Sequence, residues 1–113
     1  MMRALWTAAS GMKAQQLNVD VISNNLSNVN TTGYKKQRIE FKDLLYETLS
    51  RADVLEGQGR PVNMQVGHGV IPNSTVTTYT VGNFEKTDNP LDLAINGEGF
   101  FVVRNANGET VYT

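Results

Sequence analysis

Apolar residues recur every seven positions along the first 30 residues of the chain. The first row consists of Leu5, Met12, Val19 and Leu26. A second row, three positions further on, consists of Ala8, Gln15, Ile22 and Val29, in which Gln15 alone is polar. Rows with this spacing are the a and d positions of coiled coils. Because residues 3–30 also lack proline, the pattern predicts one continuous helix of the coiled-coil type, ended by Gly33.

The other positions of this helix are mostly neutral and polar. Its only charged residues are Arg3, Lys13 and Asp20, whereas Asn and Ser are frequent. Both are poor helix formers, so the helix is expected to be marginal alone in water. Neutral amides can contact other protein surfaces without the desolvation cost of a buried charge. Two interpretations stay open: a helix that orders only inside an assembly, and an ordinary amphipathic helix packed on its own domain.

The middle of the chain, residues 34–73, has a mixed pattern. Ile39 and Phe41 alternate as in a strand, which predicts an extended lead-in. The next apolar residues are spaced as in a short helical turn: Leu44, Leu45 and Leu49. Residues 51–73 are rich in glycine and contain Pro61 and Pro72, which predicts a loop or an irregular hairpin.

From Ser74 onward the pattern is that of β-strands. Strands are predicted over residues 75–81, 91–95, 100–103 and 109–113. The pair Asn107-Gly108 is a hairpin turn signal between the last two.

The predicted fold class is therefore α+β, with three parts. Residues 1–33 form the helical domain, residues 34–73 the extended connection, and residues 74–113 the start of a β-rich outer domain. The heptads have no partner helix in the chain, and the last strand stops at Thr113 without a further partner. Both features predict an N-terminal piece of a longer protein.

Composition argues against several classes of function. The formal charge is −1, which gives no electrostatic case for nucleic-acid binding. The chain has no cysteine and a single histidine, His68, so thiol catalysis, Cys-ligated zinc and a metal site made of clustered histidines are excluded. Paired glycines such as Gly57 and Gly59 lack the rest of a nucleotide-binding fingerprint. We therefore expect neither an enzyme nor a cofactor, and we expect Trp6 to be a buried anchor at the helix start or in an interface.

One segment is long and specific enough to suggest a family. Residues 23–35, with the sequence SNNLSNVNTTGYK, resemble the N-terminal signature of the bacterial flagellar basal-body rod and hook proteins. Upstream, residues 5–12 extend the match with LWTAASGM. Downstream, residues 92–102 resemble a second block of that family with DLAINGEGFFV. Residues 41–46, FKDLLY, are more similar to the distal rod members than to the hook or proximal rod members.

The resemblance implies a structural subunit rather than an enzyme. Such subunits pass unfolded through the flagellar export apparatus without a cleaved signal. They assemble as homo-oligomers into a helical tube that crosses the periplasm beside other rod proteins and the hook protein. The resemblance also implies that the segment from about residue 46 to residue 66 keeps a distal rod straight.

The resemblance also implies two sets of contact residues. A helix seam would pair with a C-terminal helix that this chain lacks, through Leu5, Met12, Val19, Ile22, Leu26 and Val29. Contacts with neighbouring subunits would involve Asn24, Asn25, Asn28, Asn30, Gly33 and Tyr34.

Two alternatives stay open at this point. The chain could come from the hook protein or another rod protein of the same family. It could instead be a soluble adaptor or ligand-binding module, which predicts a folded monomer with a well-formed pocket. A rod subunit predicts a poorly ordered N-terminal third in the isolated chain.

Overall fold

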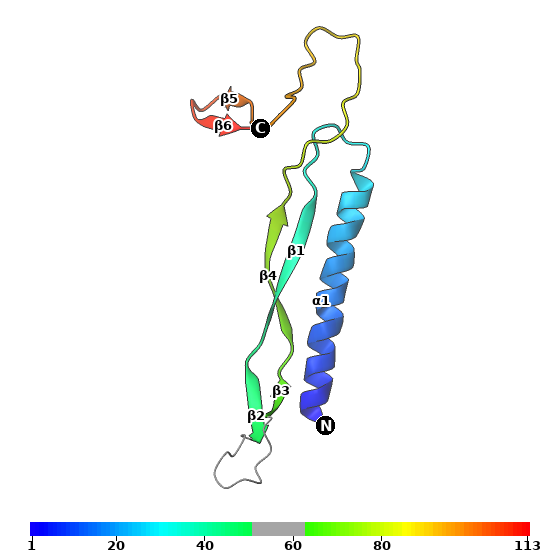
Figure 1. The fold of residues 1–113 in the computed structure, drawn as a ribbon, viewed down its shortest axis with the longest axis vertical. Coiled ribbons are helices and arrows are strands. Elements are labelled where there is room, and N and C mark those ends of the chain that lie inside the picture. Colours follow the sequence, from blue (N-terminus) through cyan, green and yellow to red (C-terminus); the bar gives the residue numbers. More distant parts are fainter. Residues whose placement is uncertain (51–62) are drawn as a thin grey trace. The chain divides into compact units, whose positions relative to one another are not determined.

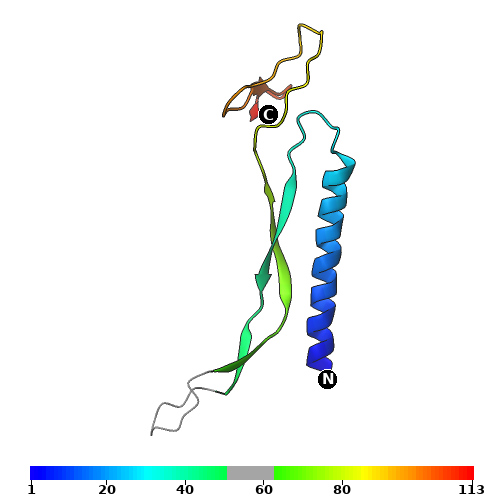
Figure 2. The same ribbon diagram turned by 45° about the vertical axis from the view of Figure 1, so that its right-hand side comes forward.

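The computed structural model describes residues 1–50 and 63–113, which fall into two compact units, Met1–Thr78 and Tyr79–Thr113. In the first unit, helix α1 (Met2–Ser27) runs alongside a long two-stranded ribbon (Figures 1 and 2). Residues 51–62 lie outside the described part, so the expectation for the loop and for much of the straightening stretch is not addressed there.

The ribbon consists of two antiparallel strand pairs placed end to end. Strand β1 (Gln37–Asp43) pairs with β4 (Val70–Thr77), and β2 (Tyr46–Ser50) pairs with β3 (Met64–Gly67). Two backbone hydrogen bonds join the pairs: the Leu44 N–H donates to the Gly69 carbonyl at 2.9 Å, and the His68 N–H donates to the Leu45 carbonyl at 3.3 Å. The α+β class is confirmed.

The predicted N-terminal helix is confirmed, but it ends at Ser27 rather than at residue 30. The Asn28 side chain donates to the Asn24 carbonyl at 2.9 Å and so satisfies one of the last free carbonyls of the helix. Gly33 has a φ of +72° but lies in the turn that follows. The expectation that Gly33 ends the helix was therefore wrong, because an asparagine side chain already closes the last turn.

The short helical turn predicted around Leu44, Leu45 and Leu49 was also wrong. Leu49 belongs to strand β2, which is paired with β3. Hydrogen bonds to a partner strand distant in the sequence outweigh a local apolar spacing. The hairpin alternative for residues 51–73 holds for the described residues from Met64 onward.

Strand β4 begins earlier than the sequence predicted. It starts at Val70 and ends at Thr77, so it crosses the boundary placed between residues 73 and 74. Pro72 lies opposite Phe41, where the strand register shifts after Glu40. A proline has no N–H to donate, and such an irregularity is one of the places in a sheet that tolerate it.

The second unit contains one short hairpin of β5 (Val102–Arg104) and β6 (Thr110–Tyr112). Its turn has Gly108 at a φ of +84°, with the Gly108 N–H donating to the Asn105 carbonyl at 2.9 Å, so the predicted Asn107-Gly108 turn is confirmed. The strand predicted over residues 91–95 was wrong. Asn89 bends the chain there, because its side-chain oxygen accepts from the Leu91 N–H at 3.2 Å.

The helix and the ribbon approach closely at Ser10 and Gly69. The Ser10 hydroxyl donates to the Thr7 carbonyl at 2.8 Å and accepts from the Val70 N–H at 3.4 Å. A Cβ at Gly69 would overlap the Ser10 hydroxyl, and Gly69 has a φ of +119°, which L side chains rarely adopt. The position therefore requires glycine both for its backbone conformation and for the contact.

We expect Gly69→Ala to weaken the ribbon by about 1–3 kcal/mol. The amide of Leu44, which donates to the Gly69 carbonyl, should exchange with solvent correspondingly faster. Gly11→Ala is the matched control, since no atom lies within 4 Å of its added Cβ. That substitution should stabilise the helix by about 0.5–1 kcal/mol. Equal exchange of the Leu44 amide in wild type and Gly69→Ala would contradict the assignment.

Candidate assembly surface

The side of α1 that faces the ribbon is made mostly of small and polar residues, together with Leu17 and Val21. Ala14 is the only buried residue in the described part of the chain, with 5% of its surface exposed. Its helical neighbours on this side are half-buried: Thr7, Ser10, Gly11, Leu17, Asn18, Val21 and Asn25. Small side chains let the backbone of the helix come close to the backbone of the ribbon, as the contact between Ser10 and Gly69 shows.

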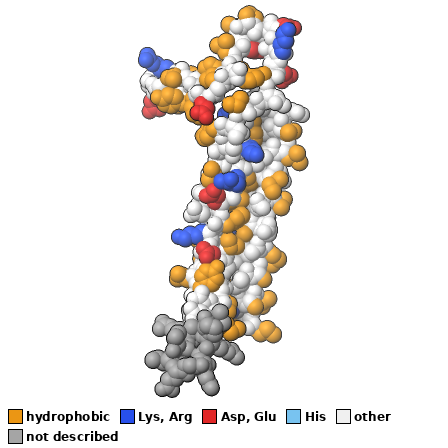
Figure 3. Space-filling view, viewed as in Figure 1, with side chains coloured by type: hydrophobic (Ala, Val, Ile, Leu, Met, Phe, Trp, Pro, Cys, Tyr) orange, Lys and Arg blue, Asp and Glu red, His pale blue; other side chains and the backbone are white. Residues whose placement is uncertain are grey.

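Most of the large apolar residues of the predicted seam lie on α1, outside the part of the helix that the ribbon covers, and Val29 lies in the turn that follows it. The six residues of the predicted seam are between 56% and 70% exposed: Leu5, Met12, Val19, Ile22, Leu26 and Val29. Figure 3 shows hydrophobic side chains along the outer edge of the helix. Leu5 and Thr7 illustrate the geometry, because two positions along an α-helix turn a side chain by about 200°. The first unit therefore leaves these six apolar side chains exposed; we call the six residues the seam.

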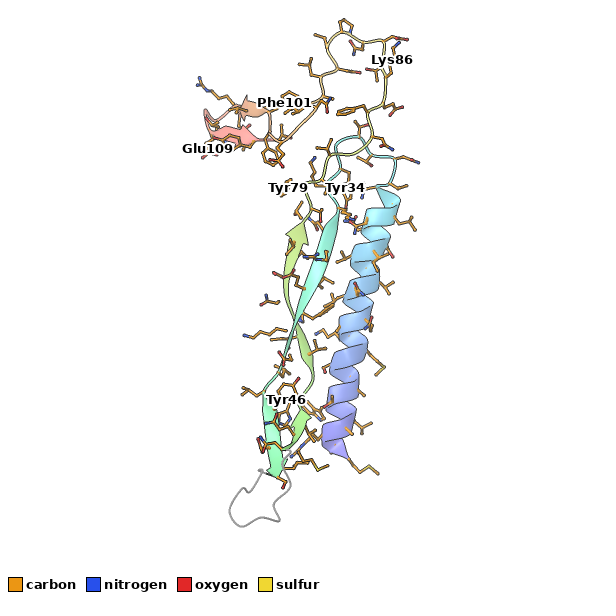
Figure 4. The ribbon with its side chains drawn as sticks, in the orientation of Figure 1. Tyr34, Tyr46, Tyr79, Lys86, Phe101 and Glu109 are labelled. Carbon is orange, nitrogen blue, oxygen red and sulfur yellow. The ribbon has the colours of Figure 1, made fainter. Side chains whose placement is uncertain are left out.

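The C-terminal end of α1 is fastened to β1 by the Asn25 side chain. Its oxygen accepts from the Tyr34 hydroxyl and from the Gln37 N–H, each at 3.0 Å. Its amide nitrogen donates to the Gln37 carbonyl at 2.7 Å. Asn25 thus pairs with the backbone of Gln37 as a neighbouring strand would, and Tyr34 lies beside the end of the helix (Figure 4). We call this arrangement the Asn25 clasp.

The other predicted interface residues surround the clasp. Asn24 donates weakly to the Tyr34 hydroxyl at 3.4 Å, and Asn28 donates to the Asn24 carbonyl. Asn30 and Gly33 lie in the exposed turn after the helix. The sequence patterns did not predict that Asn25 holds its own strand, since the Asn-rich run looked equally suited to external contacts. Contacts of these residues with neighbouring subunits stay a prediction.

At the other end of α1, charged side chains connect the helix to β2. The Arg3 guanidinium lies 2.6 Å from a carboxylate oxygen of Glu47, and His68 Nε2 lies 3.9 Å from the same oxygen. All three side chains are partly exposed, so this ion pair contributes at most about 1 kcal/mol to stability. Trp6, predicted as a buried anchor, is 74% exposed in the chain, so only its interface alternative is left.

Tyr46 lies at the start of β2, near the point where the β1–β4 pair of the ribbon meets the β2–β3 pair (Figure 4). Its ring lies over Gly67, the residue opposite it on β3, where an added Cβ would come within 3.1 Å of the ring. A hydrogen bond to Asp43, reinforced by the negative charge of that carboxylate, raises the pKa of the Tyr46 hydroxyl. The hydroxyl therefore stays protonated and donates to Asp43 across the physiological pH range.

The described residues contain no helix that is long and apolar enough to span a membrane. Within the same residues, no three potential metal-binding side chains gather in one place. The first unit presents a helix with exposed apolar residues. The Asn25 clasp and the Arg3–Glu47 ion pair join the two ends of this helix to the ribbon.

The chain is similar to proteins of the bacterial flagellum. Residues 5–35 match the family model described as "Flagella basal body rod protein". The chain is 52% identical over 115 aligned positions to the flagellar basal-body rod protein FlgG of Borreliella burgdorferi, covering 100% of this chain and 43% of that protein. It is also 52% identical to the FlgG of Caulobacter vibrioides, covering 99% of this chain and 44% of that protein.

Hook proteins are similar to a lesser degree. The flagellar hook protein FlgE of Helicobacter mustelae is 42% identical over 112 positions, covering 97% of this chain and 25% of that protein. The chain thus spans less than half the length of the relatives it matches.

Proposed function

Since this chain belongs to the bacterial flagellar rod and hook protein family, we propose that it is a structural subunit of the distal rod of the flagellar basal body. In this role it assembles with further copies of itself into a helical tube and transmits torque from the motor to the hook. Its neighbours are other rod proteins and the hook protein. It reaches the periplasm-spanning rod through the flagellar export apparatus, without a cleaved signal, and performs no catalysis.

The observation that carries this proposal is the exposed seam on α1. A monomeric globular domain would turn its large apolar residues toward its own ribbon, because apolar burial is the main driving force of folding. Here the ribbon covers the small residues around Ala14, and the seam residues such as Met12 and Leu26 face outward. Such a face is complete only when another helix packs on it.

The distal rod is favoured over the hook by degree of similarity. The chain is 52% identical to the FlgG relatives named above and 42% identical to the hook protein of Helicobacter mustelae. The third alternative, a soluble adaptor or ligand-binding module, predicts a well-formed pocket. The two best-formed hollows in the described residues are open grooves along α1, of about 830 and 440 Å³.

Hydrogen exchange separates a subunit that orders on assembly from a self-contained module. We expect the amides of Met2–Ser27 to exchange much faster in the isolated chain than in isolated basal bodies. The reason is that a helix with one covered face and an open seam is only marginally stable by itself. Equally strong protection of the helix in the isolated monomer would favour the module and contradict the proposal.

A further inference from the structure

The tripeptide Asn-Gly-Glu occurs twice in the second unit, at residues 96–98 and at residues 107–109. Every residue of both segments is exposed to solvent. The residues that follow each asparagine are therefore identical, whereas the backbone structure around the two segments differs. This makes the pair an internal comparison, in which a difference in reactivity between the two asparagines reports on the structure around them.

An asparagine followed by a glycine is prone to lose its side-chain amide, since asparagine is among the chemically labile residues. The backbone nitrogen of the glycine attacks the side-chain carbonyl carbon of the asparagine and gives up its proton, and the former side-chain nitrogen leaves as ammonia. Glycine favours this attack because it has no Cβ to restrict its backbone or to hinder the approach. Water then opens the cyclic succinimide at either of its carbonyl groups, which leaves an aspartate or an isoaspartyl link. Water is consumed, ammonia is released, and nothing is oxidised or reduced.

The hairpin between β5 and β6 restrains the second segment against this attack. The Gly108 N–H, which would have to attack, donates to the Asn105 carbonyl at 2.9 Å. The Asn105 N–H in turn donates to the Glu109 carbonyl at 2.8 Å, and the paired strands continue on both sides of the turn. Attack on the Asn107 side chain therefore requires this turn to open first.

The first segment lacks such a restraint. Asn96 and Gly97 lie in a bend outside the strands of the second unit. Among the described residues, the Gly97 N–H has no hydrogen-bond acceptor and the Asn96 side chain makes no hydrogen bond. The glycines on both sides of Glu98, with φ of +142° and +154°, have no Cβ to limit rotation of the peptide. The Gly97 nitrogen can therefore turn toward the Asn96 side chain without breaking a hydrogen bond.

We propose that Asn96 is a site of spontaneous deamidation, with water as the reactant, and that the hairpin turn protects Asn107 from the same reaction. The modification replaces a neutral amide by a carboxylate two positions from Glu98 and makes the net charge of the chain more negative. The isoaspartyl product also adds a carbon atom to the main chain. The inference goes beyond the proposed function and does not depend on it, because it uses the second unit alone.

Incubation of the purified protein in neutral buffer, followed by peptide mass spectrometry, tests the proposal. Trypsin cleaves after Arg104, so the two asparagines fall in separate peptides, and fragment masses identify the modified residue. Water enriched in heavy oxygen labels the molecules that react during the incubation and distinguishes them from those modified earlier. We expect Asn96 to convert at least about fivefold faster than Asn107, the factor in rate that one backbone hydrogen bond supplies.

Unfolding in guanidinium chloride is the control for the local sequence. The hydrogen bond of the Gly108 N–H is lost there, so the two asparagines should convert at similar rates. A difference of the same size in the unfolded chain would show that sequence, and not structure, decides the rates. That result would overturn the proposal, as would equal rates in the folded protein.

Asn96→Gln is the matched variant, because glutamine keeps the amide but its longer side chain closes the corresponding ring much more slowly. Conversion at residue 96 should disappear in this variant, while the rate at Asn107 should stay unchanged. If the peptide containing residue 96 still gains the label at the wild-type rate, the reactive amide lies elsewhere in that peptide and the assignment of Asn96 is wrong.

Discussion

Ile22→Asp is expected to prevent rod assembly and to abolish swimming. In the proposed tube the seam packs against another helix, and the substitution places a carboxylate in the middle of that contact. A buried charge without a partner costs about 3–5 kcal/mol, and the cost recurs in every subunit. Electron microscopy of basal bodies and motility in soft agar measure the result, with the variant expressed from the gene's own locus.

The control for this substitution is Ile22→Leu, which keeps an apolar side chain of the same size and should leave swimming unchanged. The isolated chain offers a second control. Because Ile22 is 56% exposed there, Ile22→Asp should lower the helix content measured by circular dichroism no further than the small difference in helix propensity between Ile and Asp accounts for. Normal rods and normal swimming in the Ile22→Asp strain would show that the seam is not an assembly contact.

Asn25→Ala is expected to release the end of the helix from β1. The substitution removes three hydrogen bonds, those to the Tyr34 hydroxyl and to both backbone groups of Gln37. We expect a loss of about 1–3 kcal/mol, because the Gln37 groups keep part of their access to water. The amide of Gln37 reports on this loss directly, and its hydrogen exchange should become about fivefold faster or more.

Asn30→Ala provides the matched control, since it removes the same side chain from the exposed turn five residues later. It should leave the exchange of the Gln37 amide unchanged. If Asn30 also contacts a neighbouring subunit, as predicted from the resemblance, the same variant should weaken assembly without weakening the chain. Unchanged Gln37 exchange in Asn25→Ala would mean that the clasp contributes nothing in solution.

Much of the fold was predictable where a pattern is local and repeated. The heptads from Leu5 to Leu26 predicted α1, and the Asn107-Gly108 pair predicted the last turn. Errors arose where distant partners decide the structure. Leu45 and Leu49 have helical spacing, but Leu49 lies in strand β2, which pairs with the distant strand β3. Conversely, the alternation over residues 91–95 is typical of a strand, yet Asn89 starts a turn at that point.

The candidate surface was predictable in part for the same reason. The heptad spacing identified the seam residues of α1 as one group, but this spacing does not show which side of the helix the ribbon covers. The clasp depends on a 12-residue separation between Asn25 and Gln37, and the Arg3–Glu47 pair spans an even larger one. Contacts between residues so far apart produce no pattern in the local sequence. Both features therefore became visible only in the three-dimensional structure.

The exposed seam of α1 also affects how the stability of the proposed assembly depends on temperature. In the proposed assembly, residues such as Met12 and Val19 leave water only when subunits join. Burial of apolar surface lowers the heat capacity, and its contribution to the free energy becomes smaller on cooling. An assembly held mainly through such residues loosens in the cold as well as at high temperature. The side chains that the ribbon leaves outside thus give the assembled structure a lower limit of stability in addition to an upper one.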